Sequence, residues 1–278
     1  MSAESSNKTI AWVNGEFIDA STISLSAFDA GLTVGLGVFD TLCGYDGEPF
    51  DFNKHYVRLA KGAVALGLTK PDKEQVYQAV LGVMTRNDFS DGKCRLRITV
   101  LAANPEQKVI VTAAGLTVRD PLSTCVVATS RVNEFSHLVG IKSTCYASNL
   151  IELQLAQKAG ADEAIMLNSR GELCEGVTSN VFIVKDGALL TPPLTSGCLP
   201  GVTRETVLEL CEALQIEVKE EELSLSDLFA CDEAFLTSSL REVQSIASVD
   251  GIELPRVVDG ITATLQKAYL AKVNHGSE

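Results

Sequence analysis

Two dipeptides that favour tight turns, Asn14-Gly15 and Asp186-Gly187, each lie between stretches of apolar residues. An asparagine or aspartate followed by glycine readily adopts the positive φ angles of a two-residue turn between antiparallel strands. The sequence therefore predicts one hairpin over residues 10–18 and another over residues 181–191. Antiparallel strands are thus expected in both halves of this chain of 278 residues.

Helical patterns separate the predicted strands. Tyr56, Leu59, Ala60 and Ala63 recur at the spacing of one helix face, and Pro71 precedes a second predicted helix over residues 72–86. Helices are also predicted over 149–159 and from residue 203, and strands over 95–101, 109–118, 125–129 and 164–167. Because strands and helices are mixed without regular alternation, the pattern predicts an α+β (mixed α/β) fold.

The predicted helix from Thr203 has an apolar face. The residues expected on this one face are Val207, Leu210, Cys211 and Leu214.

A length of 278 residues suits one large or two medium domains. The sequence Arg119-Asp120-Pro121 breaks the apolar pattern between two predicted strands, since proline restricts the residue before it. We therefore expect a linker over residues 115–121, a smaller N-terminal α/β domain over 1–118 and a larger C-terminal domain over 119–278.

The charge and hydropathy patterns exclude several classes of partner. A formal net charge of -13 argues against nucleic-acid binding, which depends on clustered lysine and arginine, but leaves small-molecule chemistry open. No apolar run approaches the ~18 residues of a membrane span, and residues 1–9 lack the basic and apolar parts of a targeting segment. The sequence therefore predicts a cytoplasmic protein that binds neither nucleic acid nor membrane.

The eight cysteines and three histidines follow no metal-binding pattern. The cysteines include no C-x-x-C pair, so buried reduced thiols are expected rather than a zinc site or a disulfide framework. His55, His137 and His275 are expected to be structural or exposed. No metal site is predicted.

Three segments in the second half carry residues suited to chemistry. Lys142 lies between an apolar stretch and a predicted helix start, where a buried amine can attack a carbonyl, although a single lysine is ordinarily a solvated surface group. Residues 172–182, ELCEGVTSNVF, read as a polar turn running into an apolar strand, or as an ordinary loop. Residues 197–204, GCLPGVTR, lead into a helix whose first N–H groups attract an anion.

In this order and spacing the three segments resemble the class IV aminotransferase family, the fold-type IV enzymes that use pyridoxal phosphate. The family includes branched-chain and D-amino-acid aminotransferases and 4-amino-4-deoxychorismate lyase. The resemblance covers essentially the whole chain and is best over residues 141–204. It implies a homodimer whose chains have two domains with the active site between them, the larger domain carrying the cofactor lysine.

By this resemblance, Lys142 binds pyridoxal phosphate as a Schiff base and Glu175 keeps the pyridine nitrogen protonated. A protonated ring accepts the electrons left when the substrate loses its α proton. The amine of Lys142 then moves that proton as general base and acid.

The resemblance also assigns contacts around the cofactor. Phosphate contacts are expected from Val202, Thr203, Arg58, and Ser239 with its neighbour Ser238. Helical spacing places Arg58 off the apolar face, so a surface arginine is the alternative. Tyr146 and Ser179 are expected near the ring or its 3-oxygen, with plain core packing as the alternative.

Two segments depart from the family pattern. Residues 29–41 look like the family's first substrate-lining segment, but Val34 stands where many members have an aromatic residue and Leu36 where many have aspartate. The glycines of this segment serve only tight turns in the alternative interpretation. Residues 102–104 lack the arginine and glycine that many members use for a substrate carboxylate. The remaining candidates for that role are Arg97, Lys108 and Arg241, although solvation at a strand edge explains each about as well.

The expected activity is transfer of an amino group between an amino acid, branched-chain-like or D, and a 2-oxo acid. The alternative is 4-amino-4-deoxychorismate lyase, which releases 4-aminobenzoate and pyruvate and which the segment 37–41 and the chain length also resemble. A binding protein that retains the fold without the cofactor is a third hypothesis, which the presence of Lys142 and Glu175 disfavours.

Overall fold

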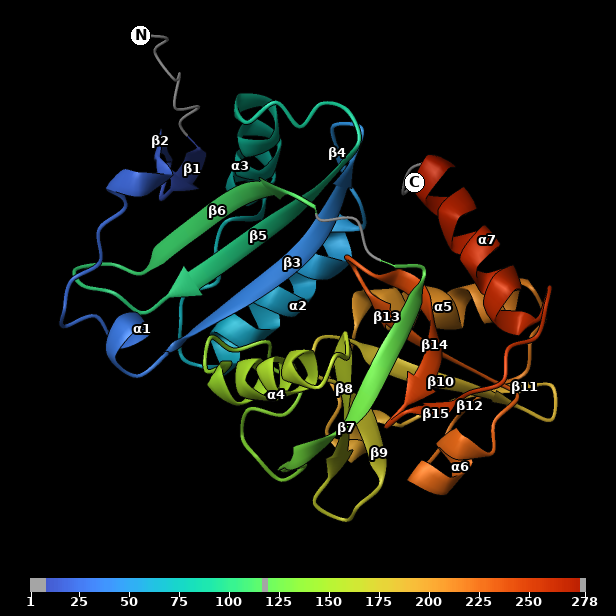
Figure 1. The fold of residues 1–278 in the computed structure, drawn as a ribbon. Coiled ribbons are helices and arrows are strands. Elements are labelled where there is room, and N and C mark those ends of the chain that lie inside the picture. The colour runs from blue at the N-terminus through green and yellow to red at the C-terminus, as the bar shows by residue number, and fades with distance from the viewer. Residues whose placement is uncertain (1–8, 117–119, 276–278) are drawn as a thin grey trace, which may run out of the picture. The chain divides into compact units, whose positions relative to one another are not determined.

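The computed structural model describes residues 9–116 and 120–275, and these divide into two compact units (Figure 1). The first unit is built from the described parts of Met1–Thr117 and from Lys142–Cys145, and the second from those of Val118–Ile141 and Tyr146–Glu278. The boundary predicted between residues 118 and 119 lies outside the described residues, as does the end of the strand predicted over 109–118. The Lys142–Cys145 segment, which was expected in the larger domain, belongs to the first unit.

The first unit contains a six-stranded antiparallel sheet with the order β2-β1-β6-β5-β3-β4. Its strands are β1 (Ile10–Val13), β2 (Glu16–Asp19), β3 (Gly37–Tyr45), β4 (Glu48–Pro49), β5 (Lys93–Leu101) and β6 (Lys108–Gly115). The predicted first hairpin is confirmed, since Asn14 and Gly15 take φ angles of 46° and 106° between β1 and β2.

Helices α2 (Phe52–Ala65) and α3 (Lys73–Arg86) pack against this sheet, as Figure 1 shows. The four residues predicted on one face of α2, at positions 56, 59, 60 and 63, are all buried. Asp72 begins α3 as predicted, because its side chain accepts a hydrogen bond of 2.8 Å from the N–H of Gln75. The two short helices of the unit are η1 (Ala20–Thr22) and α1 (Ala30–Thr33).

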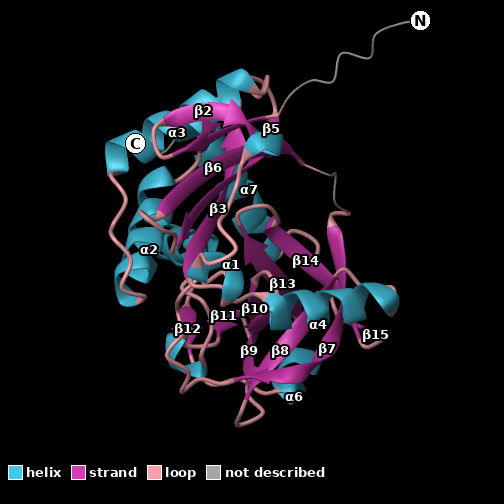
Figure 2. Ribbon diagram, turned by 90° about the vertical axis from the view of Figure 1, so that its left-hand side faces the viewer, coloured by secondary structure: helices cyan, strands magenta, loops and turns pink. Residues whose placement is uncertain are grey.

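The second unit contains a mixed nine-stranded sheet with the order β12-β11-β10-β13-β14-β7-β8-β9, and β15 pairs with β14 (Figure 2). The pairs β11/β12, β14/β7 and β7/β8 are parallel and the others antiparallel. The strands are β7 (Leu122–Val132), β8 (Glu163–Asn168), β9 (Leu173–Gly176), β10 (Asn180–Lys185), β11 (Ala188–Thr191), β12 (Val218–Glu220), β13 (Glu233–Ser238), β14 (Glu242–Val249) and β15 (Ile252–Glu253). The second predicted hairpin, over β10 and β11, is confirmed.

The helices of this unit are α4 (Ala147–Lys158), η2 (Leu194–Ser196), α5 (Val202–Ala213), α6 (Leu225–Phe229) and α7 (Ile261–His275). Strand β8 is buried along its whole length because its side chains alternate between two clusters. Ile165 and Leu167 join the main core of the sheet, whereas Ala164 and Met166 pack in a second cluster with Ala156 of α4.

The prediction for Leu214 was wrong. Helix α5 ends at Ala213, and Leu214 is its C-cap residue with 43% of its surface exposed. The helical periodicity that placed Leu214 on the apolar face therefore stops one residue before it.

All eight cysteines lie in the described residues and are free thiols. Seven are buried as predicted, but Cys145 is exposed. Burial raises the pKa of Cys125 to about 12 and those of Cys211 and Cys231 to about 11. Within the described residues, the structure has no helix long and apolar enough to cross a membrane.

Candidate active site

The Lys142 segment is attached to the edge of β3 by backbone hydrogen bonds. The N–H of Phe39 donates to the carbonyl of Lys142 over 2.9 Å, and the N–H of Thr144 donates to the carbonyl of Gly37 over 2.9 Å. Val38 and Ser143 form an isolated antiparallel bridge between these two bonds. The segment thus satisfies backbone groups of β3 that would otherwise be unpaired, which explains why it belongs to the first unit.

The Phe39 ring also contacts two positively charged side chains. The Nζ atom of Lys142 lies 4.8 Å from the centroid of the Phe39 ring, and the Cζ atom of Arg97 lies 3.8 Å from it. Arg97 donates in addition from Nε to the Thr99 hydroxyl over 3.2 Å. Solvation at a strand edge does not describe Arg97, because β5 is paired with β6 and β3 on its two sides. The predicted cofactor lysine, Lys142, and the predicted substrate residue Arg97 therefore both make cation–π contacts with the Phe39 ring.

Arg58 of α2 forms an ion pair with Asp40 of β3. Arg58 donates from Nε to Asp40 Oδ2 over 2.9 Å and from Nη2 to Asp40 Oδ1 over 2.7 Å. The side chain of Arg58 is only 11% exposed and that of Asp40 is fully buried. The alternative of a surface arginine was therefore wrong, because a buried carboxylate on β3 draws the guanidinium inward.

His55 contacts the same carboxylate. Its Nδ1 atom lies 2.7 Å from Asp40 Oδ1, and its side chain is 2% exposed. Burial alone would raise the pKa of Asp40, but Arg58 and His55 outweigh that effect and hold the pKa well below its ordinary value. Burial lowers the pKa of His55 and outweighs the opposing effect of Asp40. An ionised Asp40 thus faces Arg58 and a neutral His55.

The two segments that depart from the family pattern contact each other. The N–H of Gly31 donates to the carbonyl of Ala102 over 2.8 Å, and the N–H of Ala102 donates to the carbonyl of Leu36 over 3.0 Å. Buried Asp29 accepts a further bond of 3.0 Å from the N–H of Asn104. The two changes therefore belong to one surface rather than to two independent sites.

The glycines of the 29–37 segment serve more than turns. Gly35 has a φ of 67°, which favours glycine. A Cβ atom at Gly31 would lie only 2.8 Å from the Leu101 Cβ, so this glycine allows the two segments to approach. The Thr144 hydroxyl donates to the carbonyl of Gly35 over 2.6 Å, which links this surface to the Lys142 segment. Val34 itself is 67% exposed.

In the second unit, Glu175 of β9 accepts a hydrogen bond of 2.9 Å at Oε2 from the N–H of Leu199. The Asn180 side chain at the start of β10 donates to the carbonyl of the same Leu199 over 2.8 Å. These two bonds hold both peptide groups of Leu199 just before α5, whose N-cap is Gly201. The predicted ring partner and the predicted anion site are thus parts of one hydrogen-bonded structure.

The start of α5 suits an anion. The first N–H groups of a helix have no acceptor within the helix, and Thr203 is buried in that first turn. Thr237 of β13 pairs with Asn180 of β10, and the Thr237 hydroxyl is buried with no hydrogen-bond partner among the described residues. Ser238, which ends β13, accepts from the N–H of Arg241 over 3.2 Å, and Ser239 follows it. A helix start beside an unpaired buried hydroxyl fits a phosphate group.

The turn between β9 and β10 is fixed from both sides. The N–H of Gly176 donates to the carbonyl of Ser179 over 2.8 Å, and the Tyr146 hydroxyl donates to the carbonyl of Val177 over 2.8 Å. The Ser179 hydroxyl donates to buried Glu163 over 3.3 Å. Tyr146 and Ser179 are therefore held by polar bonds rather than by core packing alone.

Arg241 lies in the interior of the second unit. Its guanidinium is 3.2 Å from Glu163 Oε2, and it donates to the Gln244 side chain over 2.6 Å and to the carbonyl of Asp162 over 3.0 Å. Its side chain is 2% exposed, so solvation at a strand edge was the wrong interpretation. The buried carboxylate matches its charge, which gives Arg241 a structural role rather than contact with a substrate. Lys108, which begins β6 opposite Leu101, is half-buried.

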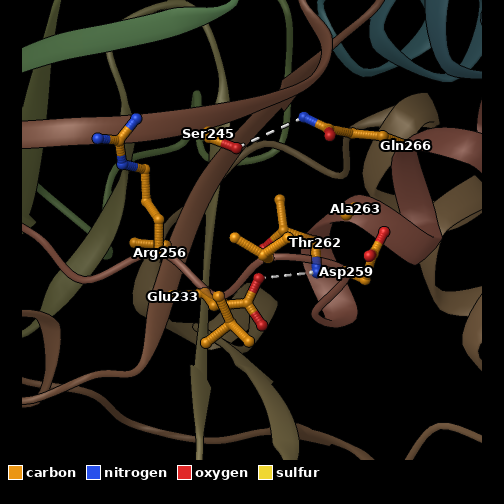
Figure 3. Close-up of a pocket in the computed structure, with 10 residues that line it drawn as sticks. Glu233, Ser245, Arg256, Asp259, Thr262, Ala263 and Gln266 are labelled. Carbon is orange, nitrogen blue, oxygen red and sulfur yellow. Dashed lines mark hydrogen bonds between the residues drawn. The ribbon is translucent and has the colours of Figure 1, made fainter.

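A cavity of about 190 Å³ lies at the start of α7 (Figure 3). Its lining includes Glu233, Arg256, Asp259 and Thr262, and contains none of the residues predicted for the active site. The Glu233 carboxylate accepts from the N–H groups of Ile261 and Thr262 over 3.0 and 3.1 Å. Because the protein's own carboxylate occupies this helix start, the cavity is not a second anion site.

Comparison with known proteins identifies the family. The sequence model of the family amino-transferase class IV matches residues 37–249. This range includes the Lys142 segment, the β9–β10 turn and the start of α5. The chain belongs to this family.

Individual relatives agree with the assignment. A protein of Methanocaldococcus jannaschii, provisionally described as a branched-chain-amino-acid aminotransferase, is 33% identical over 86% of this chain and 88% of its own. An aminodeoxychorismate lyase of Bacillus subtilis is 26% identical over 95% of this chain and 94% of its own. The structure of a branched-chain aminotransferase from Thermobaculum terrenum in its PLP form superimposes with a TM-score of 0.84 at 26% identity, covering 95% of this chain and 93% of that one.

These findings confirm the predicted fold-type IV class and the predicted activity. The chain is a class IV aminotransferase, an enzyme dependent on pyridoxal phosphate. The comparisons favour the aminotransferase over the lyase, since the higher identity is to the relative described as an aminotransferase.

Sequence reasoning missed several residues that bond to predicted site residues or to the segment before α5, among them Asp40, Asn180 and Glu163. Asp40 carried a readable signal, because it is the only charged residue in the apolar stretch from Gly37 to Tyr45. Asn180 and Glu163 gave no such signal, since their partners Leu199 and Arg241 are 19 and 78 residues away along the chain.

Gly201→Ala tests the structure around the start of α5. A Cβ atom at position 201 would overlap the Asn180 side-chain oxygen, so the substitution is expected to destabilise the protein by about 1–3 kcal/mol. Gly115→Ala is the matched control, because a Cβ there meets nothing within 4 Å. Urea unfolding of both variants measures the difference. Equal stabilities would show that Asn180 does not pack against Gly201.

Proposed function

We propose that this aminotransferase moves the amino group of a branched-chain-like aliphatic amino acid to a 2-oxo acid, using pyridoxal phosphate bound by Lys142. The observation that carries the proposal is the attachment of Lys142 to β3 through Phe39, which fixes a half-buried amine in a family-matched segment. The cofactor, when bound, supplies the electron sink that allows the α carbon of the amino acid to lose its proton.

Residues of this chain are proposed to have distinct roles in the reaction. Lys142 would hold the cofactor, and its amine, once released by the incoming amino acid, would remove the α proton and return it during transfer. Glu175 keeps a proton on the ring nitrogen, and its bond from the Leu199 N–H supports this role by fixing the carboxylate. Tyr146 and Ser179 orient the ring, which their polar bonds to the β9–β10 turn and to Glu163 support.

The proposed phosphate contacts are backbone N–H groups, hydroxyls and one guanidinium. The backbone of Val202 and Thr203 and the Thr203 hydroxyl contribute from α5. Ser238 and Ser239 also contribute, and they follow Thr237, whose buried hydroxyl has no hydrogen-bond partner among the described residues. Arg58 contributes a positive charge, and its buried ion pair with Asp40 fixes the orientation of its guanidinium.

Arg97 is the proposed partner of the substrate carboxylate. It shares the Phe39 ring with Lys142, whereas Arg241 is engaged with Glu163. Lys108 remains the second candidate. An aliphatic substrate is supported by the relatives' branched-chain activity and by apolar residues at positions 34, 36 and 102 of the two contacting segments.

Lys142 is tested by chemical trapping. Borohydride reduction of the holoenzyme is expected to leave a pyridoxyl group on Lys142, located by peptide mass spectrometry, and Lys142→Ala is expected to lose both the label and the activity. Lys158→Ala, which removes an exposed lysine at the end of α4, serves as the control and keeps both. A label on another lysine of the unmodified protein contradicts the assignment.

The substrate assignment is tested by a donor screen. Branched aliphatic amino acids alone are expected to bleach the visible band of the cofactor faster than aspartate or glutamate does. Arg97→Gln is expected to raise the KM for the oxo acid about tenfold or more, since a charge-assisted hydrogen bond is worth roughly 1.5–3 kcal/mol. If the protein releases 4-aminobenzoate from aminodeoxychorismate without any oxo acid, the transaminase assignment fails.

A homodimer is also proposed. Leu150, Ile151 and Leu155 of α4 are 50%, 56% and 43% exposed, an apolar face that a second copy would cover. Ile151→Asp is expected to yield a monomer in light scattering after size exclusion. Val258→Asp is the control, because Val258 is 90% exposed outside α4 and its substitution leaves the dimer intact. A monomeric unmodified protein contradicts the proposal.

We further propose a cytoplasmic location. Eight cysteines without a disulfide, all within the described residues, support a reducing compartment.

A further inference from the structure

We propose that Asp40 is a positioning residue, which acts through Arg58 to direct a guanidinium at the phosphate of the cofactor. This inference rests on the proposed function, because it requires that Arg58 contact that phosphate. The inference adds a role for Asp40, whose fully buried carboxylate is paired with Arg58.

The geometry between Asp40 and Arg58 fixes a direction as well as a distance. The two carboxylate oxygens accept from two different nitrogens of one guanidinium, Oδ2 from Nε over 2.9 Å and Oδ1 from Nη2 over 2.7 Å. A two-point pair of this kind sets the plane of the guanidinium, which a single hydrogen bond does not. The orientation of the whole Arg58 guanidinium, including the edge that does not bond to Asp40, is therefore set by β3.

The Asp40 carboxylate is itself held in place. Its Oδ1 atom accepts from the N–H of Thr41 over 2.8 Å and from His55 over 2.7 Å, in addition to Arg58. Because Asp40 is ionised and can only accept, Nδ1 of His55 carries the hydrogen. Three donors on one buried oxygen prevent the carboxylate from rotating. The guanidinium that is bonded to this carboxylate therefore keeps its orientation as well.

Strand β3 supports the two proposed cofactor contacts of the first unit at consecutive residues. Phe39 holds Lys142 through its N–H and its ring, and Asp40 holds Arg58 through its carboxylate. Successive side chains of a strand point to opposite faces, so the Phe39 ring and the Asp40 carboxylate do not compete for the same partner. Since β3 pairs with β5 from Gly37 to Tyr45, these two supports keep a constant spacing.

The experiment compares two ligands, pyridoxal phosphate and pyridoxal, which differ only in the phosphate. Equilibrium dialysis gives the ratio of their affinities for the unmodified protein and for Asp40→Asn. An amide can accept from Arg58 but also presents N–H groups to it, so the two-point pair is lost. The preference for the phosphorylated ligand is expected to fall about tenfold or more, while pyridoxal affinity changes little.

Controls separate positioning from a general loss of structure. Glu152→Gln also removes a buried carboxylate, one bonded to Thr129 and Ser130, and is expected to leave the ratio unchanged. Asp40→Glu keeps the charge but moves it by one methylene, and it carries the same test if Asp40→Asn does not fold. In an Arg58→Met background, Asp40→Asn is expected to change the ratio no further, because Asp40 acts only through Arg58.

An unchanged ratio would overturn the inference alone, as would a ratio that rises because Asp40 merely neutralises Arg58. A ratio that falls equally in the Arg58→Met background would also overturn it, since Asp40 would then act independently of Arg58. An unmodified protein that shows no preference for the phosphorylated ligand would instead overturn the cofactor assignment, and this inference with it.

Discussion

The edge of β3 is the constraint on which the placement of Lys142 and Arg58 depends. A strand edge leaves N–H and C=O groups that must find partners, and here the Lys142 segment supplies them through Phe39 and Gly37. The lysine is thereby fixed to a sheet rather than to a free loop. The neighbouring residue on the same strand, Asp40, fixes Arg58. One strand therefore determines where an amine and a guanidinium lie.

The second unit achieves a similar result with a peptide group instead of a strand edge. Leu199 gives its N–H to Glu175 and its C=O to Asn180, so one residue links the carboxylate of β9 to the start of α5. The interior ion pair of Arg241 and Glu163 supports the adjoining β9–β10 turn through the Ser179 hydroxyl.

Much of the fold was readable from local signals. The turn dipeptides at 14–15 and 186–187, the apolar face of α2 and the cap at Asp72 act over a few residues, so the sequence alone predicted those elements correctly. Lys142 and Glu175 were predicted as site residues through a family resemblance, not through their neighbours. Arg58 and Arg241 were harder, because their burial depends on Asp40 and Glu163, which are 18 and 78 residues away. Long-range ion pairs of this kind leave no periodic pattern.

Strand β3 is proposed to place Lys142 and Arg58 for the two ends of one cofactor. A crystal structure of the protein with pyridoxal phosphate tests it most directly. The account predicts electron density continuous from the Lys142 side chain into the cofactor, with a phosphate oxygen within hydrogen-bond distance of Arg58 and the Asp40 pair intact. Density that joins another lysine, or a phosphate that has no contact with Arg58, would contradict the account.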